Sequence, residues 1–487
     1  MRITKYILLL LILFSLIISP VQQHFPFCRE EPLHGFFTES KLPELKYFTW
    51  GRWFSSIFQN DFSTGTDNNI GFRKSLIRIS NQLDYSLFGI THAKNFISGK
   101  NGYLFEEDYI HEYNGDYFIG TPALDKKLQR LKNVMDSLAA HKVPLLLVFE
   151  PGKASFYPEH IPNRFHPEEK RQNNYNYLVK RATELGLPFM DLNRYFLQIK
   201  DTSRYPLFPK YGMHWSMYGT QVVADTLSRL VAKSSGKPMP EFKVQKIHHS
   251  GNSLGSDFDI GELLNLLFPL PAAPAAYPMV SFHSIPPGIP SALVIGDSYY
   301  ITLIETYGAK MFGKQDFWYY NKKIYPYQND IPPVLVDKSD LREKLKKYDV
   351  IMLMVSEINL HSGFWDFADE AYLAFHPEAR DPHVYRIENQ IRNEREWFQF
   401  VAAHAKLEQS TLEKSIRVNA EYTFSVYYND LPNKGYWDTI LYITMNIRNN
   451  KEWMTQITKN AHDEQMDVDT ALKLNAIYSY DQSKKKQ

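Results

Sequence analysis

The stretch LVIGDS at residues 293–298 decides the fold of this chain, and YYITLIETY follows it directly at residues 299–307. The apolar run that begins at Ala292 is typical of a strand buried on both faces of a parallel sheet, and the segment after it is typical of a helix. Gly296 permits a tight turn between the two. The hydroxyl of Ser298 would then lie at the carboxyl edge of the sheet, where open α/β sheets bind ligands.

Ser298 is therefore a candidate nucleophile, with Asp297 in a supporting role. The turn formed by Gly296 and Ser298 would present backbone N–H groups that can hold a developing oxyanion. The alternative is an ordinary turn in which the serine caps the helix.

The sequence around this stretch alternates between strands and helices. Continuous apolar runs predict buried strands at residues 143–149 and 349–355, and a shorter strand is expected at 188–191. Apolar residues at helical spacing predict helices at residues 72–88, 124–138, 175–186 and 218–232. This alternation predicts a mostly parallel sheet that is covered on both faces. Asn101-Gly102 is a hairpin-turn signal, and the proline-rich residues 269–290 are expected to form a loop.

A serine nucleophile needs a base within hydrogen-bond reach, and His214 is the best candidate. It lies in KYGMHWSMYG at residues 210–219, just before a predicted helix. A lone histidine is more often structural, but a His-Trp pair together with the Gly-Asp-Ser turn is a less common combination.

These motifs together resemble the SGNH-hydrolase-like proteins of the alginate O-acetyltransferase type. The shared motifs are GKNGYLF at residues 99–105, Pro-x-Lys-x-x-x-Tyr-Pro at 151–158, His-Trp at 214–215, Gly-Asp-Ser at 296–298 and Ser-Glu at 356–357. The resemblance runs from about Gly99 to Asn359. It implies an SGNH-hydrolase-like three-layer α/β fold with a mostly parallel sheet over residues 99–380.

The resemblance also implies a function. Such proteins are membrane-anchored and exported, and they acetylate polysaccharides. Ser298 would form an acyl-enzyme, with His214 as general base and then general acid. The acetyl groups would come from a multi-pass membrane O-acyltransferase partner, since acetyl-CoA is cytoplasmic. No cofactor is implied.

Three residues are expected to contact the substrate, namely Lys153, Trp215 and Tyr299. Aromatic faces suit the apolar C–H faces of sugar rings. The alternatives are a solvated lysine at a strand end and a tryptophan in the core.

One departure from the family's motif concerns the acid that orients the histidine. The family has Asp two residues before His, and here that position is Gly212. Asp191 is the candidate replacement, with Glu150 and Glu357 as further strand-end acids. A backbone carbonyl is another alternative. The loss of the acid also leaves open a catalytically weak glycan-binding or assembly subunit. A separate alternative is an acetyl-glycan esterase that uses the same residues. Asn359 is a candidate oxyanion donor.

Composition and the first residues bear on partners and location. The chain has 55 Lys+Arg against 54 Asp+Glu, and this balance argues against a dedicated nucleic-acid binder. Its single cysteine excludes an internal disulfide framework and a cysteine-based zinc site, and no other metal-ligand spacing is present. Arg2 and Lys5 precede an apolar run, which predicts a signal anchor at residues 1–24 and export of the rest. No small-x-small cleavage site follows the run, which favours an uncleaved anchor; a cleaved export signal is the alternative. With the resemblance, this places the chain in a bacterial inner membrane, with its bulk in the periplasm.

The two ends of the chain differ from the α/β region. Residues 25–98 are an aromatic-rich lead-in to that region. Within residues 381–487, the sequence IRN through EW at 391–397 recurs at 447–453, and the register continues to Asn419-Ala420 and Asn475-Ala476. This predicts a C-terminal α-helical extension made of two copies of a helical hairpin.

Overall fold

The computed structural model has a six-stranded central sheet. It describes residues 2–35, 43–167, 169, 171–326, 334–338, 340–379, 382–408, 410, 412–427, 440, 443–444, 446–448, 450–463 and 468–485. The strand order is β4-β3-β10-β7-β8-β9, and only β9 runs antiparallel to its neighbour. The strands are β3 (Leu145–Glu150), β4 (Phe189–Asp191), β7 (Ser291–Gly296), β8 (Lys314–Tyr319), β9 (Lys323–Tyr325) and β10 (Val350–Ser356). The predicted, mostly parallel sheet is therefore confirmed.

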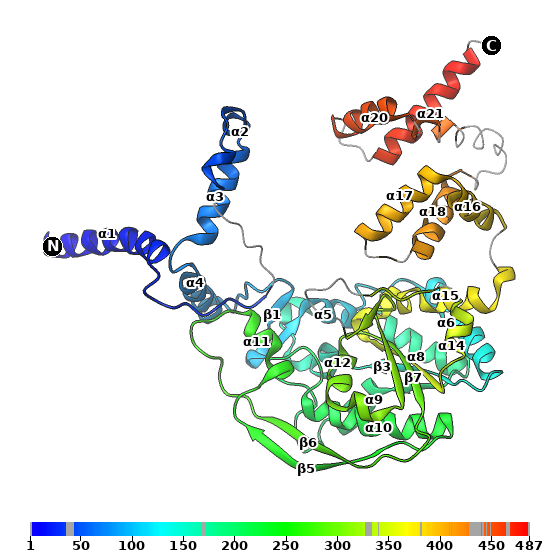
Figure 1. The fold of residues 1–487 in the computed structure, drawn as a ribbon. Coiled ribbons are helices and arrows are strands. Elements are labelled where there is room, and N and C mark those ends of the chain that lie inside the picture. Colours follow the sequence, from blue (N-terminus) through cyan, green and yellow to red (C-terminus); the bar gives the residue numbers. More distant parts are fainter. Residues whose placement is uncertain are drawn as a thin grey trace.

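Helices cover both faces of this sheet (Figure 1). Successive residues of a strand point to opposite faces, so Val294 and Met352 belong to one buried cluster and Leu293 and Ile351 to the other. The first cluster includes α9 (Leu192–Ile199), α10 (Met217–Ser235) and α12 (Tyr299–Leu303). The second includes α6 (Thr121–Ala139), α8 (Asn174–Glu184), α14 (Leu341–Leu345) and α15 (Phe367–Phe375). This is the expected three-layer arrangement.

Several short helical elements lie between the longer helices and the strands. These elements are α7 (Lys153–Phe156), η3 (Pro158–His160), η4 (Asn163–Phe165), η5 (Gly255–Phe258), α11 (Asp259–Leu263), η6 (Ile304–Gly308), α13 (Ala309–Met311), η7 (Glu357–Ser362), η8 (Phe364–Asp366) and η9 (Pro377–Ala379).

A small hairpin precedes the α/β body. β1 (Phe96–Ser98) and β2 (Leu104–Glu106) pair antiparallel across η2 (Lys100–Gly102). Asn101 and Gly102 have φ angles of 56° and 72°, which is the left-handed backbone that an Asn-Gly turn favours. The predicted hairpin is confirmed, and α5 (Glu107–Asn114) follows it.

The lead-in is helical. It contains η1 (Leu45–Tyr47), α2 (Trp50–Phe54), α3 (Ile57–Asn69) and α4 (Arg73–Phe88), of which α4 confirms the helix predicted at residues 72–88. The first helix of the chain is α1 (Arg2–His24).

In the described part of the chain, none of the helices combines the length and the hydropathy that a membrane crossing needs. The anchor expected at residues 1–24 stays a prediction.

The expectation of a loop at residues 269–290 is wrong for part of that range. β6 (Ala275–Ser284) pairs antiparallel with β5 (Glu241–Ser250), and Pro278 stands opposite Ile247. Both strands of a two-stranded ribbon are edges, so a proline that donates no hydrogen bond is tolerated there.

The C-terminal helices form two separate buried clusters. One lies among α16 (Pro382–Asn393), α17 (Arg395–Leu407) and α18 (Leu412–Tyr427), and the other includes α20 (Lys451–Asp463) and α21 (Val468–Lys485) (Figure 1). Equivalent positions are buried in both copies of the repeat: Ile391 and Ile447, Val401 and Ile457, Ala405 and Ala461, Ile416 and Leu472, Ala420 and Ala476. The first copy contacts the α/β body through ion pairs of Lys414 with Asp366 and Arg417 with Glu370.

Candidate active site

The two residues predicted to carry the chemistry lie in contact. Ser298 follows β7 and precedes α12, and His214 lies in the loop before α10. His214 Nε2 is 2.9 Å from Ser298 Oγ. Gly296 is the last residue of β7, and a Cβ there would lie only 3.2 Å from the Met354 carbonyl oxygen of β10, so a side chain at this position would be crowded. The turn therefore brings the serine to the carboxyl edge of the sheet, as the sequence predicts.

The other ring nitrogen of His214 contacts an acid that the sequence analysis missed. His214 Nδ1 is 3.1 Å from Asp259 Oδ2, and the two side chains are 13% and 28% exposed. Asp259 is the first residue of α11. Its other oxygen, Oδ1, accepts a hydrogen bond of 2.9 Å from the backbone N–H of Met213. No periodicity or motif in the sequence connects residue 259 to residue 214, so only the tertiary structure reveals this pair.

Asp191 does not take the role of the orienting acid. Its carboxylate caps α9 by accepting the N–H of Arg194, and it also accepts the Tyr175 hydroxyl. These partners hold it at the end of β4, and the acid that contacts His214 is Asp259 instead. The expectation is corrected by this placement.

Glu150 and Glu357 are strand-end acids, as expected, but both are buried. Burial raises the pKa of Glu150 well above its usual range, and it raises the pKa of Glu357 to about 8. Glu357 Oε1 accepts hydrogen bonds from Ser155 and Asn193. Neither acid is a carboxylate that faces the histidine.

Asp297 joins the ends of β7 and β10. Its side chain is fully buried and accepts hydrogen bonds from the backbone N–H groups of Tyr299 and Ser356. It also accepts the Ser356 hydroxyl at 2.6 Å and the Asn359 amide at 2.9 Å. Asp297 therefore fixes the turn that holds Ser298 and orients Asn359.

Lys153 lies in the interior rather than at a substrate-facing surface. Its side chain is 2% exposed, and its ammonium donates to the carbonyl oxygens of Lys210 at 3.0 Å and Gly212 at 2.7 Å. Burial lowers its pKa to about 7. Lys153 therefore holds the backbone just before His214, and the expected substrate contact is corrected.

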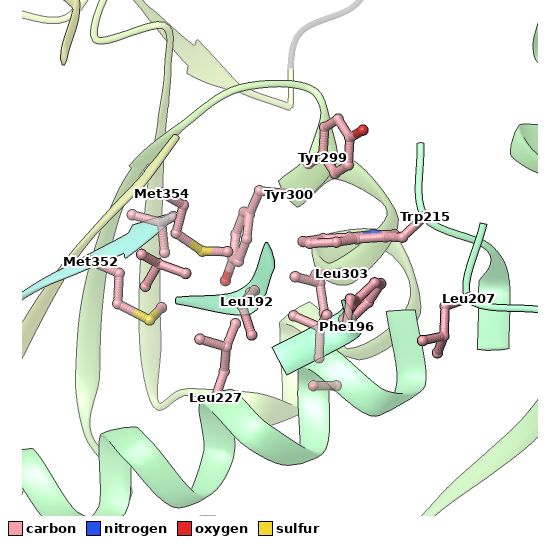
Figure 2. Close-up of a cluster of buried hydrophobic side chains, with 14 of the residues drawn as sticks. Leu192, Phe196, Leu207, Trp215, Leu227, Tyr299, Tyr300, Leu303, Met352 and Met354 are labelled. Atoms are coloured by element: carbon pink, nitrogen blue, oxygen red, sulfur yellow. The ribbon is translucent and has the colours of Figure 1, made fainter. Parts of the chain in front are cut away.

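Trp215 and Tyr299 are core residues. Figure 2 shows Trp215 packed with Phe196, Leu303 and Tyr299 in the cluster between the sheet and its helices. The Trp215 indole donates to the Thr302 hydroxyl at 2.9 Å, and the Trp215 and Tyr299 rings meet edge to face. The expectation that these two rings contact the substrate is corrected as well.

A cavity of about 500 Å³ lies beside Ser298. Its lining residues are Glu106, Asp108, Tyr109, Tyr117, Met213, Ser298, Tyr320, Ile358, Asn359 and His361. Burial and the nearby charge of Asp108 raise the pKa of Glu106 to about 7. Of this set only Ser298 and Asn359 were predicted from the sequence, because the lining comes from β2, α5, η7 and other segments that are far apart along the chain.

The backbone places the Tyr320 ring at this cavity. Tyr320 has a φ of 52°, an uncommon value for a residue other than glycine, and its N–H donates to the Gly296 carbonyl at 2.8 Å. Burial and the charge of Asp297 raise the pKa of its phenol, which therefore stays protonated and can donate a hydrogen bond.

Within the described ranges, no three His, Cys, Asp or Glu side chains are grouped so that they could hold a metal ion.

The family comparison agrees with the motif-based resemblance. Residues 96–264 match the family model described as the SGNH hydrolase-like domain of the acetyltransferase AlgX. The SGNH-hydrolase-like fold and the family resemblance are thereby confirmed. The matched residues include His214 and Asp259, and Ser298 follows them in the chain.

Curated relatives are similar over a limited length. The chain is 32% identical to the probable alginate O-acetylase AlgJ of Pseudomonas aeruginosa over 146 residues, which is 30% of this chain and 35% of the relative. It is 27% identical to the probable alginate O-acetylase AlgJ of Azotobacter vinelandii over 149 residues, 31% of this chain and 36% of the relative. The chain thus spans about a third of the length of the curated relatives it matches.

Among solved structures, the O-acetyltransferase domain of Pseudomonas putida AlgJ is similar with a TM-score of 0.37. The identity is 19%, over 55% of this chain and 92% of that domain.

Proposed function

We propose, starting from the match of residues 96–264 to an SGNH hydrolase-like acetyltransferase domain, that this protein is a polysaccharide O-acetyltransferase that works through an acetyl-enzyme. The observation that carries this proposal is the 2.9 Å contact between Ser298 Oγ and His214 Nε2 beside the cavity. A hydroxyl in contact with an imidazole nitrogen is the arrangement that activates a serine nucleophile.

The reaction has two halves. In the first, Ser298 Oγ attacks the carbonyl carbon of a donor acetyl ester while His214 Nε2 takes the hydroxyl proton. The bond from that carbon to the donor oxygen breaks, and the donor leaves with the proton from His214. In the second, a sugar hydroxyl gives its proton to His214 and attacks the acetyl carbon. The bond to Ser298 Oγ breaks, and the serine recovers its proton.

The negative charge that develops on the acetyl carbonyl oxygen needs hydrogen-bond donors. The backbone N–H of Ser298 is the proposed donor. The Asn359 amide does not serve as a second one, because it already donates to Asp297 at 2.9 Å and to the Ser356 hydroxyl at 3.0 Å. Removing one such donor typically lowers kcat by about two to three orders of magnitude.

The charge of the cavity bears on the acceptor. Its described lining contains the carboxyl groups of Glu106 and Asp108 and neither lysine nor arginine. Two like charges about 5 Å apart repel by roughly 3 kcal/mol at an effective dielectric constant of 20. We therefore propose a neutral or amino-sugar glycan as acceptor, rather than a polyuronate. The rings of Tyr109, Tyr117 and Tyr320 give the cavity aromatic surface for sugar rings.

The location and the donor partner are further proposals. Arg2 and Lys5 before the apolar run at residues 6–18 support an N-terminal anchor in a bacterial inner membrane, with the bulk of the chain in the periplasm. Acetyl groups made from cytoplasmic acetyl-CoA must then cross that membrane. A multi-pass membrane O-acyltransferase is the partner that would deliver them.

The test is an acetyl-transfer assay with the full chain and a chromogenic acetyl ester. We expect faster chromogen release and acetylated product when a neutral glycan is added, and a weaker response to a polyuronate. Ser298→Ala should abolish the activity, whereas Ser235→Ala, at the end of α10, should not change it. If the chromogen is released but no glycan accelerates its release, the activity is that of an esterase rather than a transferase. Equal inactivity of the wild type and Ser298→Ala would refute both enzymatic functions.

A further inference from the structure

We infer that Asp259 is the acid that orients His214, and that it does so from α11 because the position of the family's motif acid, Gly212, is sterically closed. This inference rests on the proposed function, since it concerns the same histidine. It names a positioning residue that acts through His214, rather than a group that touches the substrate.

Gly212 has no room for a side chain. A Cβ there would lie 2.5 Å from the Ser256 carbonyl oxygen, 2.7 Å from Pro209 Cγ and 2.9 Å from the Asp257 carbonyl carbon. Two of these three atoms belong to the backbone of η5, which leads directly into α11. An acid at residue 212 and the observed path of residues 255–263 therefore exclude each other.

The segment that fills this space is fastened to the histidine loop. The Asp259 carboxylate accepts the Met213 N–H at 2.9 Å, and the Gly261 N–H donates to the Tyr211 carbonyl at 3.1 Å. Asp257 accepts the Met217 N–H at 3.0 Å. These contacts on both sides of His214 fix the position of α11 relative to the imidazole.

The two oxygens of Asp259 have different partners. Oδ1 accepts the Met213 backbone N–H, and Oδ2 is left facing His214 Nδ1 at 3.1 Å. A carboxylate accepts hydrogen bonds and donates none, so Nδ1 carries the proton. Nε2 then presents its lone pair to the Ser298 hydroxyl, which is the tautomer that a general base requires.

The consequence for catalysis follows from this tautomer. An asparagine at residue 259 can donate from its amide to Nδ1 and shift the proton to Nε2, which then cannot accept the serine proton. In serine proteases the equivalent change lowers kcat by about 10⁴-fold. Because Asp259 is 28% exposed, we expect a loss on the order of 10³-fold in Asp259→Asn.

The experiment compares Asp259→Asn, Asp259→Glu and Glu262→Gln in the full chain. Glu262 is the matched control, because it lies on the same helix and its ion-pair partner is His34. Steady-state hydrolysis of the acetyl ester should show a large fall in kcat with little change in KM for Asp259→Asn. Asp259→Glu should recover part of the loss, and Glu262→Gln should match the wild type.

A second readout is covalent labelling by a sulfonyl fluoride, followed by intact mass. Ser298 Oγ bonds to sulfur, fluoride leaves and the hydroxyl proton goes to His214, so the labelling rate reports on the same pair. The His214→Ala background completes a double-mutant cycle. If Asp259 acts through the histidine, Asp259→Asn adds no further loss once His214 is absent. A full further loss in that background would make Asp259 merely structural and overturn the inference.

The third readout separates this inference from the proposed function. A downfield proton resonance from His214 Nδ1–H should be present in the wild type and Glu262→Gln, and absent in Asp259→Asn and His214→Ala. If the wild type shows neither hydrolysis nor labelling, the proposed function fails while this resonance still decides how His214 is oriented. Its persistence in Asp259→Asn, or wild-type kcat in that variant, would overturn the inference.

Discussion

Replacing Gly212 by alanine should impair both folding and catalysis, whereas the same replacement at Gly251 should impair neither. Neither glycine has a positive φ angle that would itself disfavour alanine. An added Cβ at Gly251 meets nothing within 4 Å, but at Gly212 it would lie 2.5 Å from the Ser256 carbonyl oxygen. The pair thus isolates the steric effect.

The size of the effect follows from the distances at Gly212. To restore an ordinary contact, the Ser256–Asp257 backbone must move by about 1 Å, and overpacking of this kind costs about 1–3 kcal/mol. Alanine recovers about 0.4–1 kcal/mol by restricting the unfolded chain. We expect Gly212→Ala to lose about 1–2 kcal/mol of unfolding free energy, and Gly251→Ala to be neutral or slightly stabilised.

The same movement affects the histidine. Asp259 follows the displaced residues by two positions, and its contact with His214 Nδ1 is already 3.1 Å. A shift of about 1 Å takes the two atoms beyond hydrogen-bond distance, because N–H···O contacts weaken beyond about 3.2 Å. We expect kcat for acetyl-ester hydrolysis to fall by about ten- to a hundredfold, with KM little changed.

Urea unfolding and steady-state hydrolysis of both alanine variants test this reasoning. The expected result is a lower urea midpoint and a lower kcat for Gly212→Ala alone. If the two variants agree within about 0.5 kcal/mol and have equal kcat, the steric account of Gly212 is refuted. If stability falls and kcat does not, the coupling between this loop and His214 is refuted.

Three other predictions concern stability, pH and the cavity. Lys153→Met leaves two buried carbonyl oxygens without their ammonium donor, so urea unfolding should show a loss of about 2 kcal/mol, while Lys200→Met should lose less than 1 kcal/mol. Burial raises the pKa of Glu357 to about 8, so the folded state holds a proton that the unfolded state releases above its ordinary pKa. The free energy of unfolding of the wild type should therefore fall between pH 5 and pH 8, by about 3 kcal/mol more than that of Glu357→Gln. If the urea midpoints of the two proteins change equally with pH, the prediction is wrong. Tyr320→Phe removes a protonated phenol from the cavity and should lower kcat for ester hydrolysis about tenfold, with thermal unfolding unchanged; an unchanged kcat would exclude the hydroxyl from the reaction.

The sequence predicts the strands that are buried along their whole length. The runs at residues 143–149, 292–295 and 349–355 are apolar throughout because strands in the middle of a parallel sheet are buried on both faces. β8 (Lys314–Tyr319) has no such run, since its first residues are partly exposed, and it was not predicted. The β5–β6 ribbon was missed because a proline argues against a strand unless its edge position is known.

The site residues that lie in a recognisable local turn or loop could be predicted from the sequence. Ser298 and His214 each stand next to a helix start that the sequence indicates, and their contact depends on the sheet that was predicted. Asp259 was not predictable, because its partner lies far away along the chain. Lys153 was placed wrongly for a related reason: a lysine is expected at the surface unless the carbonyl groups that receive it are known.

The segment that supplies Asp259 is also held from the other side by the lead-in. The Asn81 amide of α4 donates to the Leu264 carbonyl at 2.9 Å. The backbone N–H of His34 donates to the Asn265 side-chain oxygen at 2.8 Å, and the Asn265 amide donates to the His34 carbonyl at 2.9 Å. The smallest fragment that keeps Asp259 in place therefore begins well before residue 96, where the family match starts. A truncated protein that begins at that boundary would retain the sheet, Ser298 and His214. It would lose the contacts by which the N-terminal residues hold the segment that carries Asp259.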